Sequence, residues 1–278
     1  MSSGRIENVN PNVHFIEGDI RDKSLIDRLF KQHHFDIVNH HAAQMDVRKS
    51  VADPVFDAET NIIGSINLLE ASRDHSLKRF IFASTGGAIY GEQDYFPADE
   101  DHSTRPESPY GIAKRSVELY LDYYSKVHGL NYTILRYANV YGPRQDPHGE
   151  AGVVSIFTNA LLNSQKCTIY GDGKQTRDYV YVGDVVNAHV LTLEKNTGSE
   201  TFNISTGIET DVNQLFSMLS GIITEGKATA SYSESRKGEQ KRSVCSFDKA
   251  EKDLGWKPEI SLEDGLKQTV EYFKKARA

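Results

Sequence analysis

The chain has 278 residues, of which 38% are hydrophobic and 26% are charged, as in an ordinary globular protein with ample core. Its net charge of −7 argues against a nucleic-acid-binding surface, and no apolar run approaches the roughly 18 residues of a membrane-spanning helix. The two cysteines, Cys167 and Cys245, fit neither a disulfide framework nor a metal-ligand spacing, so a reducing cytoplasm is the expected location.

In the first half of the chain, short β-rich runs alternate with amphipathic helical patterns. The predicted order is a strand at 13–16, a helix around 25–30, a strand at 35–39, a helix at 55–74, a strand at 79–83, a helix from about 109 to 128 and a strand at 132–136. Strands that alternate with helices of this length indicate βαβ units and a parallel sheet.

The alternation of strand and helix patterns stops after Tyr141. Residues 142–149 are rich in turn-forming residues, which predicts a domain boundary near residue 142. The remaining predicted elements are a helix at 153–163, a β-rich stretch at 168–182 with a turn at 171–173, a helix at 185–194, a strand at 202–204, a helix at 212–223, a polar loop at 231–240 and a last helix at 262–275 capped by Ser261.

Tyr110 and Lys114 form the strongest candidate for chemistry. Ser108 is a suitable N-cap and Pro109 a suitable first residue for a helix, which puts these two side chains four residues apart on one face. A tyrosine has an ordinary pKa of about 10, and a fixed cation beside it favours the phenolate, so the pair is suited to accept a proton near neutral pH. An ordinary surface contact between the two side chains is the alternative.

Residues that directly follow the predicted strands are small or carry hydroxyl groups. Because ligands of parallel sheets bind outside the carboxyl ends of the strands, these positions are candidates for binding: 18–20, 41–44, 84–87 and 137–139. Two histidine pairs, at 33–34 and 40–41, do not predict a metal site, since neighbouring side chains on a strand point to opposite faces.

Six motifs, in order along the chain, resemble those of the extended short-chain dehydrogenase/reductases. They are Gly-Asp-Ile-Arg at 18–21, His-Ala-Ala-Gln at 41–44, Ser-Thr-Gly-Gly-Ala-Ile-Tyr-Gly at 84–91, Tyr-x-x-x-Lys at 110–114, Arg-Tyr-x-Asn-Val-Tyr-Gly-Pro-Arg at 136–144 and Arg-Asp-Tyr-Val-Tyr-Val at 177–182. Within that family the chain most resembles NAD-dependent nucleotide-sugar epimerases of the UDP-glucose 4-epimerase type. The resemblance implies an NAD-binding Rossmann-like α/β domain at 1–142, to which 177–196 returns, and a smaller α+β nucleotide-sugar-binding domain at 143–278.

The resemblance also implies roles for individual residues. Tyr110 is the catalytic proton acceptor, Lys114 its partner, and Thr85, or alternatively Ser84, the hydroxyl that hydrogen-bonds the sugar O4. The cofactor side comprises Asp19, Ile20, Ala42, Ala43, Gln44, Asn61 and Lys114. The substrate side comprises Asn139, Val153, Arg177, Arg236 and Glu239. Glu239 stands where relatives often have an aspartate, and the same resemblance leads us to expect a homodimer.

The implied reaction inverts C4 of a UDP-hexose through a transient 4-keto sugar. A related dehydratase has an Asp-Glu pair just after the threonine, and a decarboxylase tends to have a glutamate there, whereas this chain has Gly86 and Gly87. Dehydratase and decarboxylase chemistry therefore become secondary alternatives. Glucose, N-acetylglucosamine and glucuronate all stay open as the sugar.

One departure concerns the cofactor. Relatives begin with a strand, a Gly-x-x-Gly-x-x-Gly turn and a helix that hold the pyrophosphate, and this sequence begins at a position that resembles the loop after the second strand. The expectation is an N-terminally truncated Rossmann-like domain with weak or no NAD binding and poor solubility. An inactive remnant, or a protein that binds sugar nucleotides without catalysis, is the alternative to an epimerase.

Overall fold

The computed structural model describes residues 4–147, 152–195, 197–235 and 240–277. They divide into two compact units. The first comprises Met1–Ser84, Ser108–Ile134 and Gly198–Glu200, and the second comprises Thr85–Glu107, Leu135–Thr197 and Thr201–Ala278.

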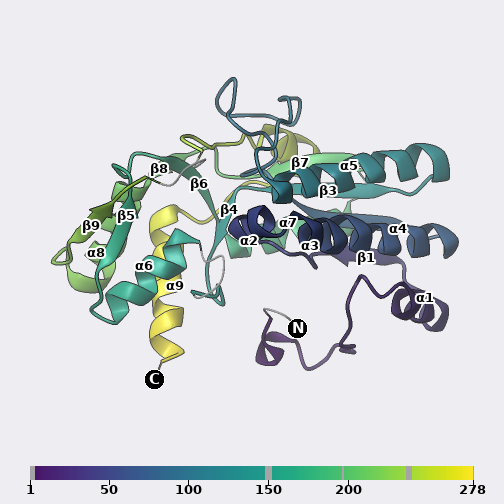
Figure 1. Cartoon of the computed structure of the whole chain (residues 1–278), viewed down its shortest axis with the longest axis horizontal. Helices are drawn as coiled ribbons and strands as arrows, with labels where there is room; N and C mark the ends of the chain where they lie inside the picture. The colour runs from purple at the N-terminus through teal and green to yellow at the C-terminus, as the bar shows by residue number, and fades with distance from the viewer. Residues whose placement is uncertain (1–3, 148–151, 196, 236–239, 278) are drawn as a thin grey trace. The chain divides into compact units, whose positions relative to one another are not determined.

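The first unit contains the helices and strands of the amino-terminal part of the chain (Figure 1). In chain order they are η1 (Ile6–Asn8), α1 (Lys23–Gln32), β1 (Ile37–His40), α2 (Val47–Ala52), α3 (Pro54–Ala58), the π-helical turn η2 (Glu59–Ile63), α4 (Gly64–Asp74), β2 (Arg79–Thr85), α5 (Pro109–His128) and the start of β3 (Tyr132–Tyr137).

Strand β1 runs parallel to β2, with Ile37 opposite Arg79 and His40 opposite Phe82. Within the described residues, the larger sheet has the strand order β1-β2-β3-β7, and helices separate its strands along the chain. This arrangement confirms the predicted α/β class with a Rossmann-like parallel sheet.

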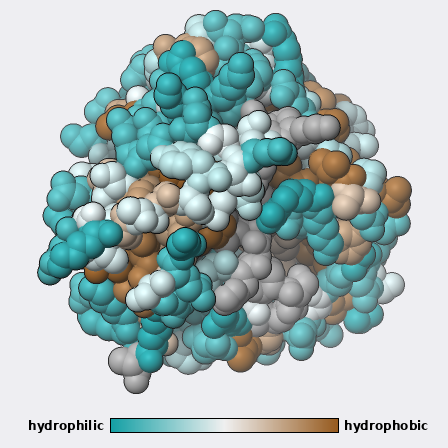
Figure 2. Space-filling model, turned by 60° about the vertical axis from the view of Figure 1, so that its left-hand side comes forward, coloured by the Kyte–Doolittle hydropathy of each residue, from teal (hydrophilic) through white to brown (hydrophobic). Residues whose placement is uncertain are grey.

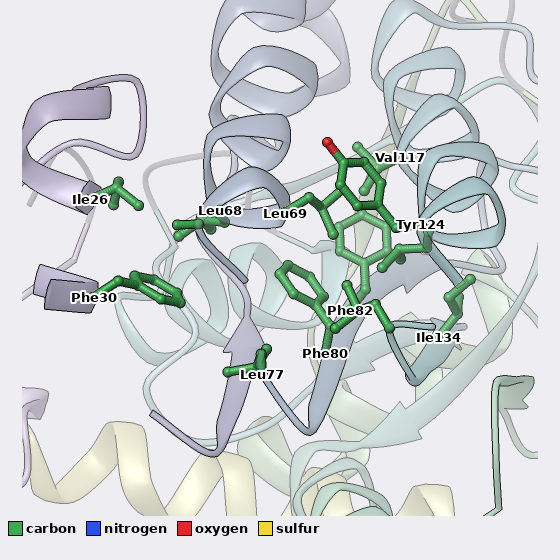
Figure 3. Packing of buried hydrophobic residues seen from close by; sticks show 13 residues of the cluster. Ile26, Phe30, Leu68, Leu69, Leu77, Phe80, Phe82, Val117, Tyr124 and Ile134 are labelled. Atoms are coloured by element: carbon green, nitrogen blue, oxygen red, sulfur yellow. The ribbon is translucent and has the colours of Figure 1, made fainter. Parts of the chain in front are cut away.

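The core of the first unit lies between the sheet and helices α1, α4 and α5. Figure 3 shows Ile26 and Phe30 of α1 on the Leu68 side of α4, with Phe80 and Phe82 of β2 directed toward the helices. Phe80 is fully buried. Burying an aromatic or aliphatic side chain of this size stabilises the fold by about 1.5–3 kcal/mol.

Two predictions for this unit were wrong in detail. Residues 13–16 form no strand, and Val13 and Phe15 are exposed, because no described strand offers them a hydrogen-bonded ladder. The predicted helix at 55–74 is a succession of α3, η2 and α4, since the extra residue of a π-turn interrupts the regular spacing. The pattern also missed α2.

The second unit contains the remaining elements. They are β4 (Asn139–Tyr141), α6 (Val153–Leu162), β5 (Cys167–Tyr170), β6 (Thr176–Tyr181), α7 (Val182–Glu194), β7 (Glu200–Ile204), β8 (Glu209–Asp211), α8 (Val212–Thr224), β9 (Ala230–Ser233), η3 (Ala250–Leu254) and α9 (Leu262–Lys275). The order β4-β6-β8 makes one small sheet among the described residues, and β5 pairs in parallel with β9. The loop predicted at 231–240 was therefore partly wrong, because β5 provides a ladder for residues 230–233.

None of the helices in the described ranges is both long and apolar enough to cross a membrane. Figure 2 shows hydrophobic residues scattered among hydrophilic ones over the face in view.

Candidate active site

Helix α5 begins as its sequence predicts. The Ser108 hydroxyl accepts a hydrogen bond from the Gly111 N–H at 3.1 Å, and Pro109 occupies the first turn. The N–H of Tyr110 donates to the Ser50 hydroxyl at 3.2 Å, and that hydroxyl donates to the Val47 carbonyl at 2.7 Å. These bonds fix the start of α5, with Tyr110, against α2.

Lys114 lies one turn further along α5 and is buried. Its Nζ donates to the Ala83 carbonyl at 2.7 Å and lies 5.8 Å from the centre of the Tyr110 ring. Burial lowers the pKa of Lys114 to about 8, while the negative charges of Asp57 and Glu118 oppose that shift. The predicted pair is therefore a half-buried phenol beside a buried ammonium.

Ser84 follows Ala83 on β2, and its hydroxyl donates to Oε1 of Glu118 at 2.7 Å. Both side chains are buried. The other carboxylate oxygen of Glu118 accepts from Arg115 Nη1 at 3.0 Å. Sequence reasoning missed Glu118, although its position four residues after Lys114 was a usable signal.

The loop after β1 is held by a network of amides. The Asn61 side chain makes two hydrogen bonds to the Gln44 backbone, each 2.8 Å long: Oδ1 accepts from the Gln44 N–H, and Nδ2 donates to the Gln44 carbonyl. Both side chains also donate to Oδ1 of buried Asp57, at 3.0 and 2.9 Å. The two amides thus fix the loop that carries Ala42 and Ala43, and Asp57 is a second residue that sequence reasoning missed.

His40, at the end of β1, is buried beneath this loop with Nε2 2.8 Å from the Ser65 hydroxyl. Because that hydroxyl donates to the Asn61 carbonyl at 2.6 Å, Nε2 must carry the hydrogen. Burial and the charge of Lys114 lower the pKa of His40 to about 3, so the ring is neutral. In the described parts of the chain, no group of three or more metal-ligating side chains occurs.

Asp19 and Ile20 are held in different ways. The Asp19 carboxylate accepts from Arg21, with Nη2 at 2.7 Å, and these hydrogen bonds lower the pKa of Asp19. The side chain of Ile20 lies directly over Gly64 of α4, where a Cβ atom would come within 2.6 Å of its Cδ1. Gly64 therefore makes room for Ile20.

In the second unit, Gly86 and Gly87 follow Thr85. The Gly86 N–H donates to the Tyr137 carbonyl at 2.6 Å. A Cβ atom at Gly87 would lie 3.1 Å from Asn139 Oδ1 and 3.9 Å from the Thr85 hydroxyl oxygen. A side chain at position 87 would therefore crowd Asn139, the predicted diphosphate contact, next to the Thr85 hydroxyl that is predicted to hydrogen-bond the sugar.

Arg177 lies on β6 opposite Thr210 of β8, and its Nη1 donates to the Thr176 carbonyl at 2.8 Å. Val153 is the first residue of α6 and is half-buried. Arg236 and Glu239 lie outside the described residues.

The chain matches the protein family described as GDP-mannose 4,6 dehydratase over residues 2–269. It is similar to the crystal structure of the Thermotoga maritima UDP-glucose 4-epimerase with UDP-glucose, with 52% identity and a TM-score of 0.97 over 100% of this chain and 90% of that one. It is also similar to the Thermus thermophilus UDP-glucose 4-epimerase in complex with NAD, with 40% identity and a TM-score of 0.91 over 99% and 89%.

A third similar structure is the UDP-N-acetylglucosamine 4-epimerase of Methanobrevibacter ruminantium in complex with UDP-N-acetylmuramic acid. It shares 35% identity with this chain and has a TM-score of 0.93, over 99% of this chain and 89% of that one.

Proposed function

Since the chain belongs to the family described as GDP-mannose 4,6 dehydratase and is an extended short-chain dehydrogenase/reductase most like the UDP-glucose 4-epimerases, we propose that it inverts C4 of a UDP-hexose with NAD. The observation that carries this proposal is the buried Lys114 ammonium beside Tyr110. In a site of low polarity, a cation at this distance stabilises a phenolate far more than it does in water.

In this reaction Tyr110 takes the proton from the sugar O4, and the Thr85 hydroxyl hydrogen-bonds the same oxygen. Ser84 is a weaker candidate than Thr85, because its hydroxyl is already donated to Glu118. NAD, when bound, supplies the acceptor and donor of the hydride at C4. After the 4-keto sugar has rotated so that its other face meets the cofactor, Tyr110 returns the proton to O4. Asn139, Arg177 and Arg236 are proposed to hold the diphosphate meanwhile.

The chain's own residues fit the cofactor on the nicotinamide side. An ammonium has three N–H donors. Among the described residues, the Lys114 ammonium donates one to the Ala83 carbonyl, so donors are left for ribose hydroxyls. The fixed loop with Ala42 and Ala43 offers small side chains where a flat ring or a sugar must come close to backbone. Asp19 and Ile20 are proposed to lie against the adenosine.

The family description names a dehydratase, and a dehydratase needs an acidic residue to help eliminate water from the keto sugar. The resemblance puts that acid pair at positions occupied here by Gly86 and Gly87. The lack of a carboxylate at positions 86 and 87 therefore favours epimerisation over elimination.

We propose UDP-glucose and UDP-galactose as the substrates. The higher identity to an epimerase solved with UDP-glucose, 52% against 35% for the N-acetylglucosamine enzyme, supports this choice. Val153, at the start of α6, is the proposed residue of the sugar side.

A homodimer through α5 is part of the proposal. Apolar side chains that are at least two-fifths exposed repeat along this helix and offer a continuous face to a second copy: Ile112, Leu119, Tyr120, Tyr123 and Val127.

The test combines cofactor release with turnover. NAD liberated by denaturing the purified chain is quantified, and the interconversion of UDP-galactose and UDP-glucose is followed with a coupled dehydrogenase. Tyr110→Phe should lower kcat by about 10²- to 10⁴-fold, whereas Tyr120→Phe on an exposed part of the same helix should not.

Unchanged turnover in Tyr110→Phe defeats the mechanism. Binding of UDP without NAD or turnover identifies a non-catalytic binder, and turnover of UDP-N-acetylglucosamine alone corrects the sugar.

A further inference from the structure

We propose that Glu118 is a positioning residue that ties α5 to the end of β2 and supplies a buried negative charge to Lys114. The inference rests on the proposed function, because it concerns the charge and placement of that site. It assigns Glu118 no contact with substrate or cofactor.

The geometry begins with two neighbouring residues of β2 that are held by two residues one turn apart on α5. Lys114 Nζ donates to the Ala83 carbonyl at 2.7 Å, and the next residue, Ser84, donates its hydroxyl to Glu118 at 2.7 Å. The following residue in the chain is Thr85. One helix therefore carries Tyr110 and also fastens the backbone that leads into the proposed sugar hydroxyl.

The burial of Glu118 requires an explanation, because removing a carboxylate from water is costly unless it is paired and hydrogen-bonded. Glu118 is 2% exposed, and its oxygens accept from Ser84 and Arg115. A neutral acceptor would satisfy Ser84 equally well. The negative charge acts on buried Lys114, four residues earlier on the same helix, where it raises the pKa of the ammonium against the effect of burial.

The charged and titratable groups around Lys114 come from α3, α5, β1 and the loop after β1, where burial and the charge of Lys114 lower the pKa of His41. Asp57 of α3 and Glu118 of α5 favour the ammonium, whereas burial disfavours it. His40 of β1 is neutral, and Arg115 is paired with Glu118. Glu118 is thus one of two carboxylates that keep Lys114 protonated near neutral pH.

Two substitutions separate charge from placement. Glu118→Gln keeps an acceptor for Ser84 but removes the charge, so the pH above which turnover declines should move down by about one unit. Ser84→Ala keeps the charge and removes the hydrogen bond, so kcat should fall at every pH while that midpoint stays unchanged. Asp122→Asn, one turn further along α5 in an exposed pair with Lys126, is the matched control and should do neither.

A second readout needs no turnover. Side-chain ¹⁵N NMR of the lysines, with Lys114 assigned by Lys114→Met, should show its titration moving to lower pH in Glu118→Gln but not in Asp122→Asn. If Glu118→Gln does not fold, Glu118→Asp is measured in its place. This variant retains the charge, so Lys114 should titrate with the wild-type midpoint. An unchanged Lys114 titration in a folded Glu118→Gln protein overturns the inference. A shifted titration in a chain without epimerase activity supports the role of Glu118 while the proposed function fails.

Discussion

Lys114 is proposed to work as a cation in surroundings that penalise a cation. Its folded-state pKa is lowered to about 8 by burial, so the ammonium is present below that pH and is lost as the pH rises through it. Because the proposed mechanism requires this charge to stabilise a Tyr110 phenolate, kcat for epimerisation should fall about tenfold per pH unit above pH 8. The measurement is kcat against pH with saturating substrate. A flat profile to pH 10 would show that Lys114 does not titrate in this range.

Gly87 is expected to matter because a side chain at this position would crowd Asn139. In Gly87→Ala the new methyl group would lie 3.1 Å from Asn139 Oδ1, tighter than ordinary contact, so the amide must shift beside the Thr85 hydroxyl. We expect kcat/KM to fall by about 10- to 100-fold, since a displacement below 1 Å at a reacting group is costly. Steady-state kinetics check this, with circular dichroism to verify folding. Activity equal to that of the unchanged protein would mean that the position of the Asn139 amide does not affect turnover.

Tyr110 and Lys114 were predictable from sequence because a cap, a proline and a four-residue spacing are local signals, and the structure shows that helix start as expected. Glu118 and Asp57 were not, because a carboxylate in a helix usually faces water and only the tertiary fold buries it. The hydroxyls of Ser84 and Thr85 look alike in sequence. Only the bond from Ser84 to Glu118 distinguishes them.

At the scale of elements, Gly64 and Gly221 form a matched pair of helical glycines. A Cβ at Gly64 would meet Ile20 at 2.6 Å, whereas a Cβ at Gly221 in α8 has no neighbour within 4 Å. Gly221→Ala should therefore stabilise the fold by about 0.5–1 kcal/mol through helix propensity. Gly64→Ala should destabilise it by about 1–3 kcal/mol, because overpacking outweighs propensity. Urea unfolding of the two variants tests this contrast, and stabilisation by both would mean that Ile20 moves aside freely.

Elements with local signals at both ends were predicted well. Helix α5 ends at Gly129 in the left-handed conformation, and α9 spans Leu262–Lys275 behind the Ser261 cap, as the sequence indicated. Residues 13–16 had the right composition for a strand but no described partner, and strand formation depends on a neighbour that composition does not reveal. The π-turn η2 contains buried Asn61, which hydrogen-bonds the backbone of Gln44, and a contact between residues this far apart in the chain is not visible in local composition.

For the whole molecule, the remaining prediction concerns assembly. Leu119 and Tyr123 lie one turn apart on α5 and are 54% and 48% exposed, in the middle of its apolar face. If a second copy covers this face, sedimentation velocity should give a dimer at micromolar concentration. Leu119→Glu combined with Tyr123→Glu should give a monomer, because charges directly opposite one another in a dry interface are strongly disfavoured.

The fold should survive this double change, because both side chains already face water rather than the core. Val186→Glu on α7, where the valine is 57% exposed, is the matched control and should leave the dimer intact. A wild-type chain that sediments as a monomer removes α5 as the interface. A dimer that persists in the double variant puts the contact on another surface. Either outcome leaves the chemistry proposed for Tyr110 and Lys114 unaffected, because these two residues lie in the same unit of one chain.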